Sequence, residues 1–384
     1  MMKEDLLIEF IESHSDWKEQ LKKAPYFLKI KNSETHPNYW MLAYNLFDSD
    51  FTNDITKTCR GIVLDIDPDT NKVLGIVNYA MSKFFNYGDP NCAPIDWTTA
   101  KVLSKKDGQL IRVSKYKGEI IWCTNGAFGL NTPVDFTDDK VHDYVSLVKL
   151  ALNNDLSWID RIPEGVTVFM ELCSPYNRII CRYSDVKMWL LGARSNVSPY
   201  SEIMPEDIKA QIDIPLDIPE SYDLHSIESV LKELDKFVGY EQEGVVVRDA
   251  AFNRIKVKSK DYLRIHYMLG ENGITQDSIL TAILTDSTDD LLEFDPSLSK
   301  NIDALKKDII ACEDNLRELF SIVKEKFDEC NNDRKTFAQW AISQDNTKTL
   351  FRLLDCKDVE DIIKENRERM KNSKKPTKEL YNCK

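Results

Sequence analysis

The spacing of the hydrophobic residues changes once along this chain, and that change constrains the fold more than any other feature. Up to Lys258 the apolar residues come mostly in short runs rich in β-branched and aromatic side chains, which is typical of strands. From Asp261 onward they recur at helical spacing. The sequence therefore predicts an α+β part with antiparallel sheets and flanking helices over residues 1–265, followed by an all-helical part over residues 266–384.

Composition excludes several classes of protein. The chain has 384 residues, 42% of them hydrophobic, which is enough for two or three domains. No apolar run approaches the roughly 20 residues that a membrane-spanning helix needs, and no secretion signal begins the chain, so a cytoplasmic protein without a membrane partner is expected. The nine cysteines show no zinc spacing or disulfide framework. A net charge of −13 argues against broad, nonspecific binding to nucleic acid, although clustered lysines and arginines permit a local basic groove.

Individual elements can be predicted by residue range. The apolar residues between Leu6 and Leu21 predict one amphipathic helix that ends before Pro25. Lys117-Gly118 predicts a hairpin turn. The predicted strands are 38–46, 61–66, 73–79, 110–116, 119–123, 166–172, 178–183, 187–193, 244–247 and 254–258, and the other predicted helices are 139–152 and 227–237.

The motif Lys105-Lys106-Asp107-Gly108 supplies a candidate nucleophile. The pattern K-x-D-G often occurs by chance, and a charged surface turn is its simplest explanation. Other short motifs stand before and after it in a particular order, and this order makes a chance occurrence of K-x-D-G a weaker explanation. These are Cys59-Arg60-Gly61-Ile62, Lys83-Phe84-Phe85-Asn86, Phe169-Met170-Glu171, Glu243-Gly244-Val245-Val246-Val247 and Ile255-Lys256-Val257-Lys258.

A lysine can attack phosphorus only after it loses its proton, and its ordinary pKa is about 10.4. The cations Lys256 and Lys258, together with burial between strands, are expected to lower the pKa of Lys105. The free amine can then attack the α-phosphate of a nucleoside triphosphate. Because Lys256 and Lys258 are two residues apart on a strand, both point to one face and can stabilise the developing charge.

The other motif residues suit the same substrate. Arg60 and Lys83 can hold ribose or the outgoing phosphates, since the forked donors of arginine favour bidentate contacts. Glu171 and Glu243 suit sugar hydroxyls, or magnesium and its waters, better than they suit phosphate. No G-x-x-x-x-G-K-[ST] motif is present, so a P-loop is excluded.

Each of these residues also has an ordinary structural explanation. Lys256 and Lys258 alternate with apolar residues as on any half-exposed strand. Glu243 can be a solvated strand-start residue, and the aromatic residues after Lys83 can simply fill core. The candidate site fails only if all of these explanations hold together, and the order of the motifs argues against that.

The ordered motifs, with Met81-Ser82-Lys83-Phe84-Phe85-Asn86 and Asn177-Arg178-Ile179-Ile180, resemble the phage RNA ligase 1 family of ATP-dependent tRNA-repair ligases, within the covalent nucleotidyltransferase superfamily. The resemblance runs from about Tyr44 to Asp289 and returns at residues 333–338. It implies that Lys105 takes AMP from ATP, with Mg²⁺ as cofactor, and that Tyr262 is also catalytic. It further implies an ATP site formed by Tyr44, Arg60, Lys83, Glu171, Glu243, Lys256 and Lys258, and metal binding by Asp289, with Asp290 or Asp286 as alternatives.

This family joins RNA 5′-phosphate and 3′-hydroxyl ends through lysyl-AMP and RNA-adenylate. The resemblance thus implies RNA, above all cleaved tRNA, as substrate, selection of that tRNA by the helical part, and a bacteriophage protein in the host cytoplasm. A polynucleotide kinase-phosphatase acting upstream remains an open question. One departure is Asn125, in Thr124-Asn125-Gly126, where relatives place a basic residue.

Two alternatives remain, and the second comes from another class of protein. A DNA ligase or a capping guanylyltransferase uses the same lysine chemistry, but usually adds an OB-fold after the paired lysines, and no run of alternating strands occurs there. A catalytically silent RNA-binding protein could keep the fold without the reaction. Retention of Lys105 and of both glutamates argues against it, whereas Asn125 mildly favours it.

Overall fold

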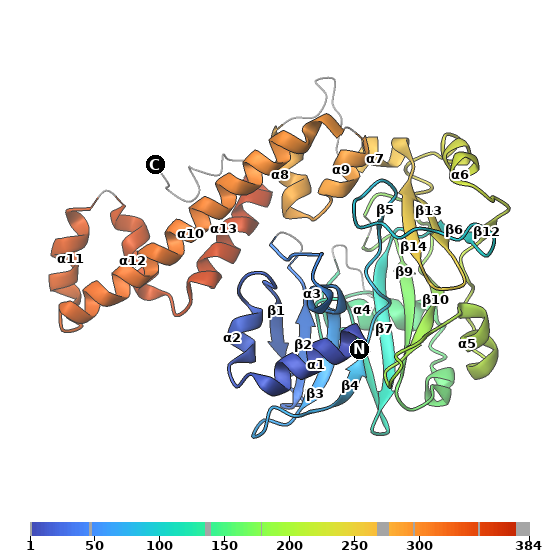
Figure 1. The fold of residues 1–384 in the computed structure, drawn as a ribbon, viewed down its shortest axis with the longest axis horizontal. Helices are drawn as coiled ribbons and strands as arrows, with labels where there is room; N and C mark the ends of the chain where they lie inside the picture. The colour runs from blue at the N-terminus through green and yellow to red at the C-terminus, as the bar shows by residue number, and fades with distance from the viewer. Residues whose placement is uncertain are drawn as a thin grey trace. The chain divides into compact units, whose positions relative to one another are not determined.

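The computed structural model describes residues 2–45, 48–134, 140–177, 179–266, 276–294, 296–344 and 346–373. The chain divides into two compact units, Met1–His266 and Tyr267–Lys384, and each is described by itself (Figure 1). The first unit is a mixed α+β structure, and the described residues of the second are helical apart from short connections. This confirms the predicted α+β class with its helical C-terminal part.

No helix among the described residues has the length and apolar character needed to cross a membrane.

The first sheet of the N-terminal unit has its strands in the order β1-β2-β3-β4, all antiparallel. Residues alternate between its two faces, as the period of a strand requires. Ile62 and Leu64 pack with the N-terminal helices, whereas Val63 packs with residues of the second sheet. The strands are β1 (Lys29–Asn32), β2 (Tyr39–Ala43), β3 (Arg60–Ile66) and β4 (Val73–Asn78), and the helices beside them are α1 (Lys3–Ser13), α2 (Trp17–Leu21) and α3 (Asp54–Thr58).

The second sheet has the order β11-β10-β9-β7-β8 and carries the largest hydrophobic core. Inward residues of three of its strands pack against two helices and a 3₁₀ turn, Ser157–Arg161. The turn residues Lys117 and Gly118 both have positive φ, 50° and 80°, which matches the predicted two-residue hairpin. The elements are β7 (Gln109–Tyr116), β8 (Glu119–Cys123), β9 (Val166–Cys173), β10 (Lys187–Ser195), β11 (Glu202–Ile203), α4 (Tyr144–Ala151) and α5 (Pro205–Ile212).

The third sheet, in the order β12-β6-β13-β14-β5, brings the motif residues together. Its pairings are antiparallel except that β5 runs parallel to β14. Helix α6 covers one face through Val230, Leu234 and the nearby Phe237. The elements are β5 (Phe85–Asn86), β6 (Lys101–Lys105), β12 (Ser221–Tyr222), β13 (Gly244–Arg248), β14 (Arg254–Lys258), α6 (Ile227–Leu234) and α7 (Lys260–His266).

The described part of the second unit is built around the 31-residue helix α10. Its buried residues include Leu305, Ile309 and Leu316, at the helical spacing seen in the sequence. Glu313 of α10 accepts two hydrogen bonds from Arg367 of α13, at 2.8 and 2.7 Å. The helices are α8 (Gln276–Leu284), α9 (Thr288–Phe294), α10 (Ser299–Glu329), α11 (Arg334–Ile342), α12 (Thr347–Asp355) and α13 (Val359–Ser373), with a 3₁₀ turn at Pro296–Leu298.

Three predicted elements differ from the structure. The single N-terminal helix is broken, because His14 has extended backbone angles and separates α1 from α2. Residues 179–183 form bends and irregular backbone instead of a strand, and Arg178 lies outside the described residues. Helix α4 begins at Tyr144 and not near residue 139, because Asp143 caps its first turn by accepting a hydrogen bond from the Ser146 amide.

Gly244 is expected to tolerate no side chain. A methyl group there would lie 2.2 Å from the carbonyl oxygen of Val257, on the neighbouring strand. We expect Gly244→Ala to lower the free energy of unfolding by about 3 kcal/mol, since backbone atoms of a paired strand can move little. Chemical denaturation measures this. Gly126→Ala is the control, because an added methyl group there meets no atom within 4 Å, and equal stabilities of the two variants would contradict the prediction.

Candidate active site

Three residues form a row across the third sheet. Lys105 ends β6, Gly244 begins β13 and Lys258 ends β14. Gly244 is the register partner of Lys105 on one side and of Lys258 on the other. Paired residues of neighbouring strands project from the same face of a sheet, so the two lysines flank a glycine that has no side chain to separate them.

The carboxylate of Glu243 bridges these two lysines. Its Oε2 lies 2.6 Å from Nζ of Lys105, and its Oε1 lies 3.2 Å from Nζ of Lys258. The Glu243 side chain is only 2% exposed, compared with 21% for Lys105 and 9% for Lys258. A carboxylate in such a place is held by charge-assisted hydrogen bonds, because an unpaired charge there would be costly.

The pKa of Lys105 is raised, and the expectation that it would be lowered is wrong for this arrangement. Burial lowers the pKa of Lys105, and Lys258 lowers it further, as expected. The opposite charge of Glu243, its hydrogen bond, and the charge of Glu171 together outweigh these effects. The sequence analysis missed the direct pairing between Glu243 and the lysine.

Asp107 fixes the backbone that carries Lys105. It is 5% exposed, and its Oδ2 accepts hydrogen bonds from the amides of Ile180 and Cys181, at 2.9 and 2.8 Å. Its Oδ1 accepts a third from the hydroxyl of Tyr262, at 3.0 Å. Tyr262, on α7, is 2% exposed and lies under Nζ of Lys258, 5.3 Å from its ring centroid. Tyr262 therefore contacts both Asp107 and Lys258.

Glu171 lies on β9, beside the glycine of the K-x-D-G motif. It accepts a hydrogen bond of 3.2 Å from the amide of Gly108. Burial raises the pKa of Glu171 to about 7, while the charge of Lys105 opposes the shift and that of Glu243 adds to it. Glu171 therefore titrates near neutral pH, and carboxyls perturbed in this way cluster at functional sites.

Tyr44, Arg60 and Lys83 form a second group near the end of β2 and the start of β3, in the first sheet. Nζ of Lys83 lies 4.8 Å from the ring centroid of Tyr44, 4.2 Å from that of Phe51 and 5.2 Å from that of Phe85. Arg60 begins β3 and directs Nη1 toward the carbonyl oxygens of Met81 and Ser82, each at 3.4 Å.

The two groups are connected through β14 and β5. Lys256, on β14, is the register partner of Asn86 on β5, and its carbonyl accepts a hydrogen bond of 2.9 Å from the Tyr87 amide. The charge of Arg60, like that of Lys105, opposes the rise in the pKa of Glu171. Nine of the ten residues in the sequence-based site thus belong to one unit.

The tenth residue, Asp289, lies in the helical unit, in the first turn of α9. Asp290 follows it and is 2% exposed, and Asp286 precedes the helix with a φ of 57°. Metal binding by any of the three stays a prediction.

Arg112 is a buried cation that the sequence analysis missed. It is fully buried on β7, and its Nη2 donates to the carbonyls of Gly61 and Thr124, at 2.9 and 2.5 Å. Its Nε and Nη1 have no hydrogen-bond partner among the described residues. Burial lowers the pKa of Arg112 to about 10, and the nearby charge of Arg60 adds to this shift. A positive charge thus lies directly behind the Thr124-Asn125-Gly126 motif, which lacks a basic residue of its own.

Three other missed residues differ in the signal that the sequence offered. Asp107 stands inside the K-x-D-G motif and could have been included from that pattern alone. Phe85 stands two residues after Lys83, inside a motif that the sequence already shows. Phe51 meets Lys83 only through the fold, because it lies in a connection before α3.

The donors present fit the magnesium ion that the resemblance implies. Glu171 and Glu243 are near enough for the charge of Glu243 to raise the pKa of Glu171. Among the described residues, no group of three or more histidine, cysteine or acidic side chains gathers to hold a metal. Magnesium commonly takes one or two carboxylates and completes its shell with phosphate oxygens and water. A bound triphosphate and these glutamates would together supply such a shell.

A family model described as RNA ligase, of the phage RNA ligase 1 type, matches residues 58–263. The chain belongs to this family. The match contains Arg60, Lys83, Lys105, both glutamates, both late lysines and Tyr262.

Individual relatives resemble the chain more distantly. A protein of Autographa californica nuclear polyhedrosis virus, named as a bifunctional polynucleotide kinase/RNA ligase, is 27% identical over 255 residues. The alignment covers 62% of this chain and 35% of the relative, so the chain spans about a third of that protein's length.

Among solved structures, an archaeal ATP-dependent RNA ligase has a TM-score of 0.47 and 14% identity, covering 76% of this chain and 74% of the other. A protein titled as an ATP-dependent DNA ligase from Aquifex aeolicus has a TM-score of 0.46 and 16% identity, covering 78% and 80%. These low scores carry no argument about function.

The titration of Glu171 predicts how stability depends on pH. Its folded-state pKa of about 7 lies above the ordinary value of 4.5, so the folded protein binds an extra proton between these values. Stability should therefore fall as pH rises from about 4.5 to 7 and then level off. Because the side chain is partly exposed, we expect Glu171 to contribute on the order of 2 kcal/mol to this decline.

Unfolding free energies between pH 5 and pH 8 test this. Glu171→Gln should reduce the decline, whereas Glu241→Gln, at an exposed position, should not. An unchanged pH profile in Glu171→Gln would show that this carboxyl is not the titrating group.

Proposed function

We propose that this protein is an ATP-dependent RNA ligase that joins 5′-phosphate and 3′-hydroxyl ends through lysyl-AMP and RNA-adenylate. One observation carries the proposal. In a chain of the RNA ligase family, the buried carboxylate of Glu243 contacts both Lys105 and Lys258. The two lysines end β6 and β14, the strands that pair with β13 on either side.

The first step requires Lys105 to lose a proton. While Glu243 contacts it, the charged form is favoured. If Glu243 turns to the ribose hydroxyls or to a metal, burial and Lys258 remain, and both lower the pKa of Lys105. Glu243 thus acts as a switch between a resting ion pair and a reactive amine. Magnesium, when bound, neutralises phosphate charge.

The neutral Nζ of Lys105 then attacks the α-phosphorus of ATP. A phosphorus–nitrogen bond forms, the bond to the β-phosphate oxygen breaks, and pyrophosphate leaves. Lys256 and Lys258 stabilise the charge on the α-phosphate, and Arg60 and Lys83 hold the outgoing phosphates. Tyr262, through Asp107, keeps the nucleophile's loop in place.

Two further steps complete the reaction. An RNA 5′-phosphate oxygen attacks the AMP phosphorus, and the phosphorus–nitrogen bond breaks to give RNA-adenylate and the lysine, which takes up a proton. A 3′-hydroxyl then attacks the 5′-phosphate, AMP leaves, and the hydroxyl proton passes to solvent.

We assign the nucleotide chemistry to residues 1–265 and RNA selection to residues 266–384. The proposed substrate is cleaved tRNA, and Asp289 is the proposed metal ligand in the helical part. The viral relative's name includes a polynucleotide kinase, which supports an upstream kinase that prepares 5′-phosphate ends. A bacteriophage source and action in the host cytoplasm complete this proposal.

Self-adenylylation tests the nucleophile. Incubation with α-labelled ATP and magnesium should leave one acid-labile AMP on the protein. The label should disappear in Lys105→Ala and remain in Lys106→Ala, since the neighbouring Lys106 pairs with Glu220 instead. Label from GTP alone would favour a capping enzyme, sealing of DNA but not RNA would favour a DNA ligase, and no label would favour a silent RNA-binding protein.

Replacement of Glu243 tests the carboxylate. We expect Glu243→Ala to slow adenylylation or sealing by at least about 100-fold, because Lys105 and Lys258 lose the group that positions them. Single-turnover assays of the separate steps measure this. Glu241→Ala, two residues away and exposed, is the control. Full activity of Glu243→Ala in every step would remove Glu243 from the site.

A further inference from the structure

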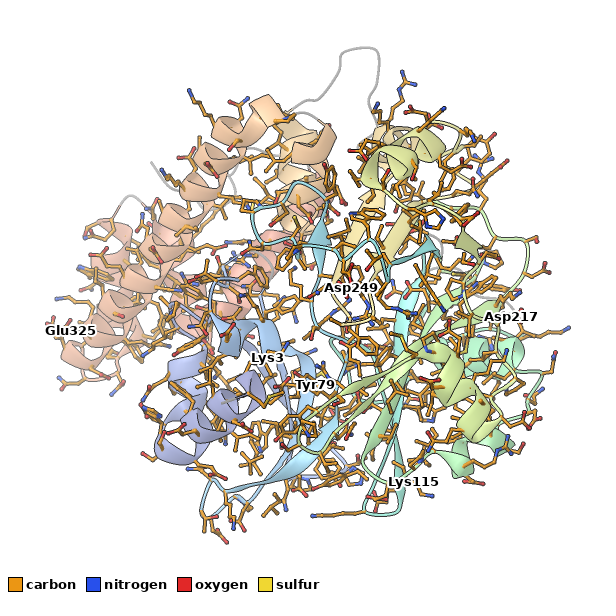
Figure 2. All side chains as sticks on the ribbon, turned by 45° about the vertical axis from the view of Figure 1, so that its right-hand side comes forward. Lys3, Tyr79, Lys115, Asp217, Asp249 and Glu325 are labelled. Atoms are coloured by element: carbon orange, nitrogen blue, oxygen red, sulfur yellow. The ribbon has the colours of Figure 1, made fainter. Side chains whose placement is uncertain are left out.

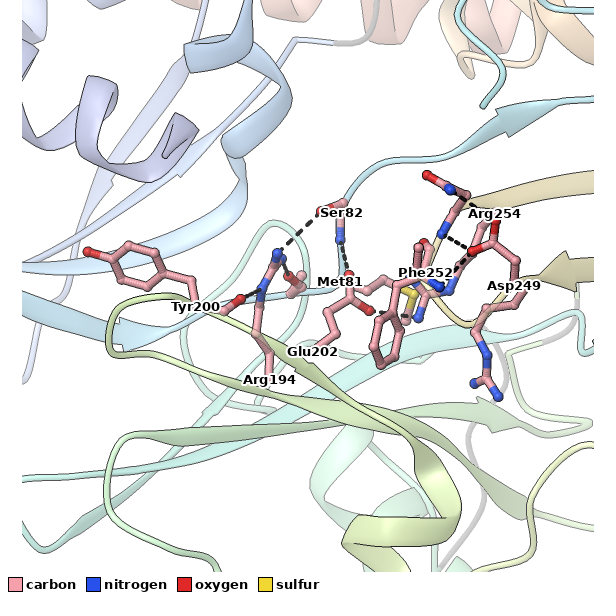
Figure 3. A network of polar contacts seen from close by, with 12 residues as sticks. Met81, Ser82, Arg194, Tyr200, Glu202, Asp249, Phe252 and Arg254 are labelled. Carbon is pink, nitrogen blue, oxygen red and sulfur yellow. Dashed lines mark hydrogen bonds and ion pairs between the residues drawn. The ribbon is translucent and has the colours of Figure 1, made fainter. Parts of the chain in front are cut away.

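The segment before Lys83 is held by a buried network of charged side chains (Figure 3). Arg194, on β10, donates to the carbonyls of Ala80 and Tyr200, each at 2.9 Å, and directs Nη2 toward Oγ of Ser82 at 3.4 Å. It is 6% exposed. The backbone on which Lys83 is mounted is thus fixed from the side of the second sheet.

Helix α1 adds contacts from the N-terminus. Lys3 donates from Nζ to Oγ of Ser82 at 2.9 Å, and the hydroxyl of Tyr79 donates to the buried Glu4 at 2.5 Å. Figure 2 labels Lys3 and Tyr79 on the ribbon. Residues about 80 positions apart in sequence therefore meet at this segment.

Glu202, on β11, joins this segment to strand β14. Its Oε1 accepts a hydrogen bond from the Ser82 amide at 3.4 Å, and its Oε2 lies 2.6 Å from Nη2 of Arg254. The side chains of Glu202 and Arg254 are only 5% and 6% exposed. Although burial alone would raise the pKa of Glu202, Arg254 and Arg194 outweigh it and hold the pKa below its ordinary value. Glu202 is therefore ionised at neutral pH.

The position of Arg254 gives this pair its significance. Arg254 begins β14, the strand that carries Lys256 and Lys258. Ser82 directly precedes Lys83, and its carbonyl oxygen accepts a hydrogen bond from Nη1 of Arg60. A single buried carboxylate thus spans the two groups of cations assigned to the triphosphate, one on β14 and the other around Lys83.

We infer that Glu202 is a positioning residue for ATP, which sets the Lys83 segment relative to the lysines of β14. The inference rests on the proposed function and deepens it. Stability alone does not account for the pair, because desolvation offsets much of the attraction in a buried ion pair, and apolar replacement of both partners is often neutral. A hydrogen-bonded ion pair instead fixes the direction and the distance between the two residues that form it, which apolar side chains do not.

The test removes both charges together, so that neither is left buried alone. We expect the double variant Glu202→Leu, Arg254→Met to bind ATP, measured as α,β-methylene-ATP with magnesium, about tenfold more weakly. AMP binding should change much less, because AMP lacks the outer phosphates that the Lys83 segment holds. The matched control is Glu313→Leu, Arg367→Met, which removes another buried pair, in the helical unit, and should leave binding of both nucleotides unchanged.

Each outcome is decisive. Selective loss of triphosphate binding, with a thermal midpoint near that of the unaltered protein, would support the inference. Unchanged ATP binding, or equal losses for ATP and AMP, would overturn it. If the double variant proves unstable, Glu202→Gln with Arg254→Met gives the same comparison, since the amide keeps the acceptor for Ser82 and no charge is left buried alone.

The proposed function is tested separately. The unaltered protein could bind nucleotide without acquiring AMP on Lys105, which would contradict the lysyl-AMP route and leave the comparison of variants valid. Failure of the unaltered protein to bind ATP would overturn both.

Discussion

The bridge from Glu243 to Lys105 and Lys258 is the interaction on which the site depends. One carboxylate compensates two lysines that would otherwise repel each other at the end of a sheet. It can do so because Gly244, the register partner of both lysines, has no side chain to keep the two ammonium groups apart. The same contact helps to raise the pKa of Lys105. In the function we propose, a substrate that draws Glu243 away makes this lysine reactive.

The sequence predicted the parts of the fold that local pattern determines. The hairpin at Lys117-Gly118, the strands rich in β-branched residues and the change to helix are all local signals, and the structure confirms them except for the strand predicted at 178–183. It did not predict where strands pair, so the contact between Glu243 and Lys105, 138 residues apart, was missed together with its effect on the pKa. Phe51 and Glu202 were missed for the same reason, because their partners are near only after folding.

The site residues come from all three sheets of the first unit. Arg60 starts a strand of the first sheet, Glu171 lies in the second, and Lys105 and Lys258 end strands of the third. A site assembled in this way needs the sheets held in fixed relation to each other. The buried contacts of Arg194 and Glu202 cross between the sheets, and we infer that they serve that purpose.

Arg112 has a consequence for how the folded protein responds to its surroundings. Its guanidinium is buried without an acidic partner among the described residues, and it lies near enough to Arg60 to feel its charge. Such an arrangement stores electrostatic repulsion in the native state. Any polyanion that settles beside Arg60 relieves that repulsion as well as forming its own contacts.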